Sequence, residues 1–188
     1  MSQRPHVDSS VAWLLMRFFP RISGSSRAMP PTDPSPLSRA LGRIPSALYI
    51  VSTLREGKPV GFVGSLVQQV GFSPPMLCLA VAKEREPLRD LRACGRFSLS
   101  LLGASSRQRM GPFLKHPAPG ASPYDGLALG HTPAGLPFLT EGLAWFECRI
   151  VSELESGDHV VVFAEVEAAA TLREGEPHLH LRRDGLAY

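Results

Sequence analysis

The sequence predicts a mostly β protein with a few short helices, in which an antiparallel sheet closes into a barrel. Roughly six or seven stretches rich in β-branched and aromatic residues follow one another at short spacing. Turn signals built on Gly, Pro and Asp separate these stretches. The sequence lacks the regular alternation of strands and long helices that is typical of a parallel sheet. Together these three observations favour a closed antiparallel barrel.

The first part of this barrel is expected to begin with a short helix over residues 37–44. Residues 46–54, SALYIVSTL, are β-branched and aromatic and predict a strand. The Glu-Gly-Lys-Pro turn that follows indicates a hairpin with a second strand over residues 60–66. Residues 78–82 are too continuously apolar for a half-exposed strand, so we expect them to cross the core.

The middle of the chain contains a predicted helix and a predicted strand. Pro87 is well placed as the first residue of a helix that runs to about Cys94, and Gly95 is expected to end it. Residues 96–101 alternate between apolar residues and serine, which is typical of a strand. Residues 105–114 resemble a helix and precede a Pro/Gly/Ser-rich loop.

The last third of the chain predicts a long antiparallel hairpin. Residues 143–154 and residues 159–169 both have strand character, and a Ser-Gly-Asp turn lies between them. Residues 178–181 are expected to form a last short strand. These elements supply the remaining strands of the predicted barrel.

Length and charge indicate one domain, residues 37–188, preceded by a flexible leader, residues 1–36. The 188 residues are 44% apolar and 20% charged, as in ordinary globular proteins. The pI of about 9.0 comes from residues 1–29, which hold four arginines and one aspartate. The remaining 16 basic and 16 acidic residues cancel (20 − 4 and 17 − 1). A nucleic-acid partner is therefore not expected.

The leader has three possible interpretations. It is rich in Arg and Ser and poor in acidic residues, as organelle-targeting segments are. It is also compatible with a dispensable or misassigned extension, for which Met29 offers an alternative start, or with a helix at a membrane surface. No apolar run reaches the length of a membrane span. We expect a cytoplasmic protein that does not bind membranes, with organelle targeting left open.

The sequence offers neither a metal site nor a side-chain catalytic set. The three cysteines are odd in number and form no C-x-x-C pair, which indicates a reducing compartment without disulfides or a zinc site. His178 and His180 lie two residues apart but lack an evident third ligand, so no metal is predicted. G-x-S-x-G, H-E-x-x-H, Walker and G-x-G-x-x-G motifs are missing. A bound cofactor is therefore expected to supply the chemistry.

Residues 60–86 are the part of the sequence best suited to hold such a cofactor. Gly61, Gly64 and Gly71 are expected to leave backbone uncovered for the flat face of another molecule. Lys83 and Arg85 would point to the same side if the strand before them continues, next to the start of the following helix. Two cations at a helix N-terminus suit a phosphate. The alternative is a hairpin followed by solvated surface charges.

A set of short segments in a particular order and spacing carries a family resemblance. They are LGRIPS from Leu41, GSLVQQ from Gly64, FSPPM from Phe72, KEREP from Lys83, LAWFEC from Leu143, GDH from Gly157 and RRDGLAY from Arg182. With these segments the chain resembles the flavin reductase-like domain, the FMN-binding split β-barrel of NAD(P)H:flavin oxidoreductases and of fused flavoproteins. The resemblance runs from about residue 37 to residue 188.

The resemblance implies a set of cofactor-binding residues. The flavin is expected to lie along Ser65, Leu66, Val67, Gln68 and Gln69, and Lys83 and Arg85 are expected to hold the FMN phosphate. His159 is expected to lie near the flavin and the nicotinamide as the catalytic residue. Tyr188, with Arg182, matches a tail that closes the flavin site. The Leu-Val-Gln-Gln stretch replaces the Ser/Thr-rich stretch of many relatives, which leaves open whether FMN is prosthetic or exchangeable.

The resemblance also implies a function. We expect an FMN-dependent flavin reductase that transfers a hydride from NADH or NADPH to flavin. A homodimer is expected, because the proteins that it resembles complete the flavin pocket with the neighbouring subunit. A monooxygenase or another electron-acceptor protein is a further possible partner. Two alternatives stay open: a non-enzymatic electron-relay module, and an enzyme of the pyridoxamine-phosphate-oxidase type on the same barrel.

Overall fold

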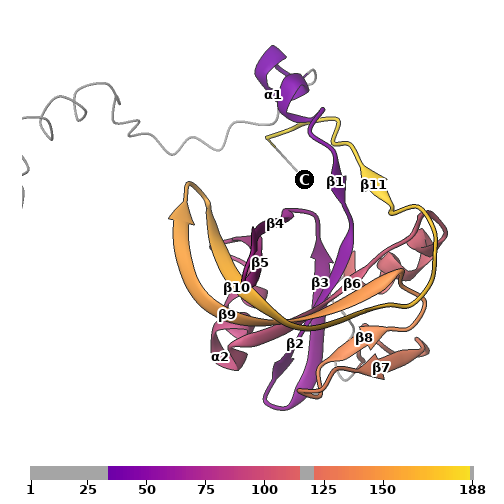
Figure 1. Cartoon of the computed structure of the whole chain (residues 1–188). Helices are drawn as coiled ribbons and strands as arrows, with labels where there is room; N and C mark the ends of the chain where they lie inside the picture. The colour runs from indigo at the N-terminus through magenta and orange to yellow at the C-terminus, as the bar shows by residue number, and fades with distance from the viewer. Residues whose placement is uncertain (1–33, 115–120, 187–188) are drawn as a thin grey trace, which may run out of the picture. The chain divides into compact units, whose positions relative to one another are not determined.

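The computed structural model of the chain describes residues 34–114 and 121–186. Its main feature is an antiparallel sheet of seven strands in the order β3-β2-β6-β9-β10-β5-β4, which curls around the larger of two apolar core clusters (Figure 1). The strands are β2 (Tyr49–Arg55), β3 (Lys58–Gly64), β4 (Val67–Phe72), β5 (Pro75–Ala82), β6 (Arg96–Leu101), β9 (Ala144–Ser156) and β10 (His159–Thr171). The predicted antiparallel barrel is confirmed.

The two edges of this sheet are consecutive in the chain. β3 and β4 lie at opposite ends of the strand order, and only Ser65 and Leu66 join them. Because this link is so short, the sheet must curl until its two edges come together there. We call the gap that remains between β3 and the end of β5 the seam. The sequence predicts one strand over residues 60–66. That strand instead stops at Gly64, and β4 begins three residues later on the other edge.

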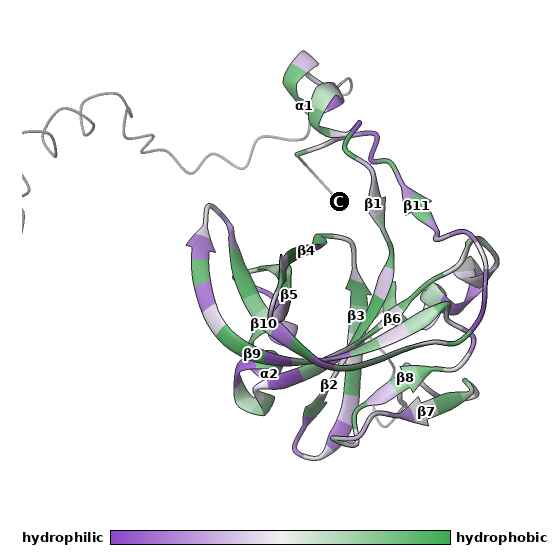
Figure 2. Ribbon diagram, viewed as in Figure 1, coloured by the Kyte–Doolittle hydropathy of each residue, from purple (hydrophilic) through white to green (hydrophobic). Residues whose placement is uncertain are grey.

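The core of the barrel comes from residues that alternate along its strands. Apolar side chains of β5, β6 and β10 are almost fully buried. They are Leu79, Val81, Phe97, Leu99, Val160 and Val162. Figure 2 shows the corresponding alternation of apolar and polar positions along the ribbon. Cys148 belongs to the same core, and burial raises the pKa of its thiol to about 12, as befits a packing residue.

Helix α2 (Glu86–Cys94) closes one end of the barrel, as predicted (Figure 1). Leu88 and Leu91 pack into the core. Pro87 lies in its first turn, and Gly95 ends it in the left-handed conformation with φ of 69°. The helix therefore begins directly after the turn that carries Lys83 and Arg85.

A small hairpin on the outside of the barrel was not predicted. β7 (Leu129–His131) pairs with β8 (Pro137–Leu139), each only three residues long. Two buried serines of β6 anchor it. The Ser98 hydroxyl donates to the Pro137 carbonyl at 2.5 Å, and the Leu139 amide donates to Ser100 Oγ at 3.0 Å. Next to it lies a 3₁₀ helix, η2 (Ala104–Leu114), where an α-helix was expected.

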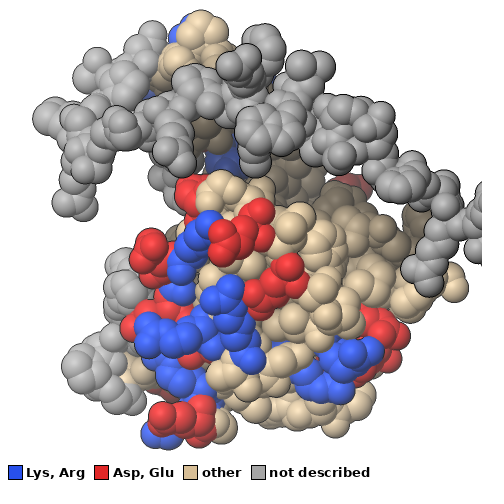
Figure 3. Space-filling view, turned by 90° about the vertical axis from the view of Figure 1, so that its left-hand side faces the viewer, with Lys and Arg blue, Asp and Glu red and all other residues tan. Residues whose placement is uncertain are grey.

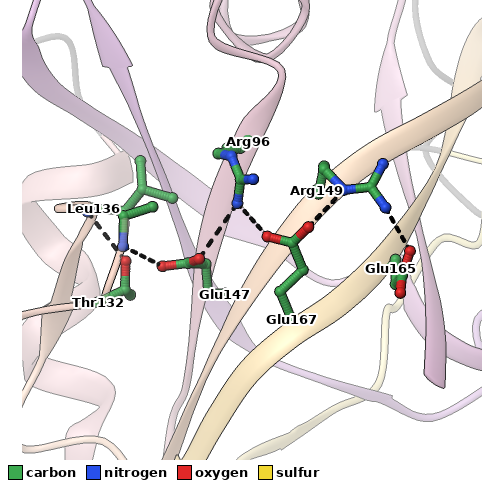
Figure 4. A network of polar contacts seen from close by, with 8 residues as sticks. Arg96, Thr132, Leu136, Glu147, Arg149, Glu165 and Glu167 are labelled. Atoms are coloured by element: carbon green, nitrogen blue, oxygen red, sulfur yellow. Dashed lines mark hydrogen bonds and ion pairs between the residues drawn. The ribbon is translucent and has the colours of Figure 1, made fainter. Parts of the chain in front are cut away.

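A chain of ion pairs crosses the outer face of β6, β9 and β10 (Figure 4). Arg96 contacts Glu147 at 3.3 Å and also Glu167, and Arg149 contacts Glu167 and Glu165, each at 2.5 Å. Glu147 is buried and accepts the Ala134 amide at 2.8 Å. The network thus fastens the loop between β7 and β8 to the long hairpin.

The ends of the described chain form an arm, residues 36–47 and 178–186, that lies apart from the seven-stranded sheet (Figure 1). It consists of α1 (Pro36–Leu41), β1 (Ser46–Ala47) and β11 (Leu179–His180), and β1 pairs with β11. The Ser38 hydroxyl donates to Asp184, and the Gly185 amide donates to the Ser38 carbonyl at 3.0 Å.

Among the described helices, none has the length and apolar content needed to cross a bilayer.

Candidate functional site

The predicted cofactor segment, residues 65–69, lies along the outer edge of β5. The Leu66 carbonyl accepts the Ala80 amide at 2.9 Å, and Val67, Gln68 and Gln69 lie opposite Leu79, Cys78 and Leu77. The segment therefore begins close to the end of β5, where the chain turns towards α2, and runs away from it. Ser65, Leu66 and Val67 are partly buried, whereas Gln68 and Gln69 are exposed.

This segment exposes main-chain hydrogen-bonding groups. In an antiparallel pair, every second residue turns its N–H and C=O towards the partner strand. Because Leu66 faces β5, Val67 and Gln69 turn their main-chain groups to the other edge, and no described strand pairs with that edge. The Gln69 carbonyl accepts only a long contact, 3.4 Å, from the amide of the Gln68 side chain. The segment therefore offers donors and acceptors to a ligand.

Three glycines were expected to leave the backbone uncovered. A Cβ on Gly64 would lie 2.7 Å from Val51 Cγ2, and a Cβ on Gly61 would collide with the Tyr124 hydroxyl. A Cβ on Gly71 would lie 3.0 Å from Met76. Because these glycines have no side chain, neighbouring atoms of the protein pack directly against their backbone. The expectation of uncovered backbone is wrong at Gly64, which is buried, whereas Gly61 still lines a cavity.

Lys83 and Arg85 lie beyond the end of β5. Their side chains were expected to point to the same side only if this strand continued through them, and it does not. The Lys83 amide donates to the Asp158 carbonyl at 3.0 Å, and Lys83 Nζ lies 2.8 Å from Glu155 Oε2 in the β9–β10 hairpin. Arg85 lies on the other side, with its guanidinium carbon 5.5 Å from the centre of the Phe62 ring on β3. The two cations therefore contact different partners.

An open cavity of about 380 Å³ lies beside Arg85, at the seam. Its lining includes Gly61 and Phe62 of β3, the turn at residues 84–87, and Phe113 of η2. Arg55 also lines it, but Asp90 binds that guanidinium through two hydrogen bonds of 2.8 Å and so raises its pKa. Arg85 forms no ion pair with any carboxylate of the described residues. It is the cation that remains available to an anionic ligand at this seam.

His159, the predicted catalytic residue, begins β10 opposite Ala82. Its side chain is 16% exposed, and Nδ1 lies 2.7 Å from Asp158 Oδ1. This hydrogen bond holds the pKa of Asp158 below its usual range. Leu66 and His159 lie on the two strands that flank β5, opposite Ala80 and Ala82 near its end. The structure therefore brings residues 65–66, Lys83 and His159 to the same end of β5.

A second cavity, of about 370 Å³, was not predicted. It lies at the other end of the cofactor segment, where Gln69 faces an apolar mouth of the barrel. Besides Gln69 and Glu167, the mouth is lined by Pro75, Met76, Leu77, Phe146, Val166, Ala168 and Ala169. The alternation along β9 and β10 indicated inward-facing residues, but nothing in the sequence marked them as neighbours of Gln69.

The remaining candidates do not join this site. Tyr188 lies outside the described residues, and the main chain of Arg182 packs against Gly42 in the arm. His178 and His180 also lie in the arm. Within residues 34–114 and 121–186, no group of three or more His, Cys, Asp or Glu side chains is arranged to hold a metal ion.

Comparison with known proteins identifies relatives with flavin chemistry. The chain is 37% identical over 164 residues to a putative diflavin flavoprotein A 3 of Synechocystis; the match covers 86% of this chain and 27% of the relative. It is 36% identical over 157 residues to diflavin flavoprotein A 1 of the same organism, again covering 27% of that protein. The chain thus spans about a quarter of the length of these curated relatives.

Solved structures show the same fold. The NADH:FAD oxidoreductase SgcE6 of Streptomyces globisporus superposes with a TM-score of 0.72 at 26% identity, covering 84% of this chain and 95% of that one. SgcE6 has also been solved in complex with NAD and FAD fragments. The styrene monooxygenase flavin reductase of Pseudomonas putida gives a TM-score of 0.68 at 27% identity, covering 78% and 93%.

The family model of the flavin reductase like domain matches residues 41–186, which include the seam, the cofactor segment and His159. The match and the barrel agree with the resemblance that the short sequence segments carry. This chain belongs to the flavin reductase-like domain family.

Proposed function

We propose that this domain is an FMN-dependent NAD(P)H:flavin oxidoreductase, which transfers a hydride from NADH or NADPH to flavin. Membership of the family supports a flavin-reducing oxidoreductase. The observation that carries the finer proposal is the convergence at the seam. Residues 65–66 and His159 flank the end of β5, and Arg85 lies in the turn that follows this strand.

The donor set of the seam fits a flavin. The polar edge of a flavin ring alternates hydrogen-bond donors and acceptors, and the open edge at Val67 and Gln69 presents both kinds of main-chain group. Ser65 adds a hydroxyl. Leu66 and Gln68, whose main-chain groups face β5, keep this edge in place. Bound FMN would supply a ring that accepts a hydride and passes electrons on.

Arg85 and Lys83 would hold the phosphate. A phosphate carries about −1.5 to −2 charge near neutral pH, and each charge-assisted hydrogen bond to it contributes on the order of 1.5–3 kcal/mol. Arg85 is the N-cap residue of α2, and the positive end of the helix dipole also favours an anion there. Phosphate recognition by these groups would favour FMN over riboflavin.

His159 would act at the reacting end of the site. Its hydrogen bond to Asp158 places a proton on Nδ1 and so orients the imidazole. The imidazolium form, in which Nε2 also carries a proton, would be a donor that stabilises negative charge developing on a reduced ring next to it. The tail that ends in Tyr188 is proposed to close the site.

We further propose that the domain works as a homodimer. The arm carries large apolar side chains that are half exposed or more, and a monomer gains nothing from them. They are Leu37, Ile44, Leu179, Leu181 and Leu186. A monooxygenase or another protein that accepts electrons is a further proposed partner. The free thiols of Cys78, Cys94 and Cys148 agree with a reducing, cytoplasmic location.

The test is anaerobic spectroscopy of the full chain with FMN. We expect NADH or NADPH to bleach the visible absorption of the oxidised flavin within one turnover. A yellow protein that stays oxidised with both nucleotides would indicate the electron-relay module instead. Peroxide formation with a pyridoxine-type substrate in air would indicate the oxidase. Binding of neither FMN nor riboflavin would remove the proposal.

A further inference from the structure

The predicted phosphate-binding Lys83 already contacts an oxyanion of the protein itself. Glu155 Oε2 lies 2.8 Å from Lys83 Nζ, and this contact holds the pKa of Glu155 below its usual range. The Lys83 amide is bound to the Asp158 carbonyl, so the turn after β5 is fastened to the tip of the β9–β10 hairpin. Glu155 is therefore held where it would compete with a bound phosphate for the ammonium group of Lys83.

Both partners remain accessible to a ligand. The Lys83 side chain is 33% exposed and that of Glu155 is 79% exposed. Figure 3, viewed from the side of the long hairpin, shows basic and acidic side chains lying next to one another over this face. An exposed ion pair of this kind is weak, because water screens it. A phosphate can therefore displace the carboxylate, but it has to compete with it.

We propose that Glu155 is a specificity-determining residue that weakens the hold of this domain on the flavin phosphate, so that FMN exchanges rather than remaining as a tightly held prosthetic group. This inference rests on the proposed function. The site would then offer one cation that stacks on Phe62 but binds no carboxylate among the described residues, Arg85, and one, Lys83, that an internal carboxylate partly neutralises.

The neighbouring ion pair on the same strand provides a matched control. Glu153 Oε2 lies 2.8 Å from Arg92 Nη2, two residues before Glu155 on β9. Glu153→Gln removes one carboxylate and one ion pair from the same hairpin, just as Glu155→Gln does. It leaves the contact between Lys83 and Glu155 in place, although Arg92, which also attracts Glu155, loses its own partner.

The experiment measures the dissociation constants of FMN and of riboflavin for the full chain and both variants, by flavin fluorescence. We expect Glu155→Gln to tighten FMN about three- to tenfold at roughly 10 mM salt and to leave riboflavin unchanged, while Glu153→Gln changes neither. At about 1 M salt, where the screening length falls to about 3 Å, the difference should shrink. Lys83→Gln should cost more FMN affinity in the Glu155→Gln background than in the natural chain.

Three results would overturn the inference. One is FMN affinity that is unchanged or weaker in Glu155→Gln, because Glu155 would then support the site. Another is an equal gain for FMN and riboflavin, which would show that Glu155 does not act on the phosphate. A third is an equal gain in Glu153→Gln. A natural chain that binds neither flavin would instead remove the proposed function, and this inference with it.

Discussion

The carbonyl of Leu66 accepts the amide of Ala80 at 2.9 Å, and this bond joins the link between the two sheet edges to the strand that leads to Lys83. It places the start of the cofactor segment about three residues from the turn that carries the two predicted phosphate ligands. Had the link been paired elsewhere, residues 65–69 and the cations would lie on different sides of the barrel. The proposed flavin site therefore depends on this pairing and on the core behind it.

Arg85→Ala should weaken FMN binding much more than riboflavin binding. Loss of a charge-assisted bond of about 1.5–3 kcal/mol corresponds to roughly a 10- to 100-fold rise in the FMN dissociation constant. Arg89→Ala, which removes an exposed cation from α2, serves as the control. Fluorescence titration with both flavins measures the effect. Equal losses for FMN and riboflavin would rule out the phosphate role of Arg85.

His159→Ala should slow flavin reduction by NADH or NADPH on the order of tenfold, because a donor next to the reduced ring is lost. The FMN dissociation constant should stay within about twofold, since the phosphate ligands remain. Anaerobic stopped-flow absorbance measures the reduction. The control is His131→Ala on β7, which is exposed. If His159→Ala reduced the flavin as fast as the natural chain does, a catalytic role of His159 would be excluded.

Gly64→Ala should destabilise the barrel by about 1–3 kcal/mol, because the added Cβ would lie 2.7 Å from Val51 Cγ2 in a buried position. The midpoint of urea unfolding should fall accordingly. Gly111→Ala is the control, because a Cβ there meets no atom within 4 Å. A variant at position 64 as stable as the natural chain would mean that Val51 on β2 moves aside at no cost.

Glu167→Gln should reduce the loss of stability in acid. Hydrogen bonds from Arg96 and then from Arg149 hold the pKa of Glu167 below 4.5 in the folded state. The stabilisation is therefore present above pH 4.5 and is lost as pH falls through the lower, folded-state pKa. Thermal melting between about pH 7 and about pH 3 measures the slope, with Glu174→Gln, in the loop between β10 and β11, as the control. Identical slopes in the Glu167 variant and the natural chain would contradict the prediction.

Leu181→Glu in the arm should shift the chain from dimer to monomer, because a charge at an apolar interface is costly to bury. Light scattering after gel filtration measures the mass. Leu154→Glu, at an exposed apolar position near the tip of β9, is the control and should leave the mass unchanged. A natural chain that is already monomeric at micromolar concentration would refute the proposed homodimer.

The sequence alone determined β2, β5, β6, β9 and β10, the helix α2 and the family. Alternation along residues 96–101 and 143–169 marks which side chains face the core, and Pro87 and Gly95 mark where α2 begins and ends, because these signals depend only on neighbours in the chain. The hairpin β7–β8 carries no comparable local signal. Its strands are three residues long, and they are held by the distant residues Ser98 and Ser100.

Only the tertiary structure decided how the parts of the candidate site meet. The break at Ser65 and Leu66, the separation of Lys83 from Arg85, and the contact of Lys83 with Glu155, 72 residues later, all depend on which strands pair across the barrel. A local pattern of residues cannot encode such pairings, because they are set by the burial of the whole sheet around one core. For the same reason the glycines at 61 and 64 looked like open backbone in the sequence, and proved to be places where the protein packs against itself.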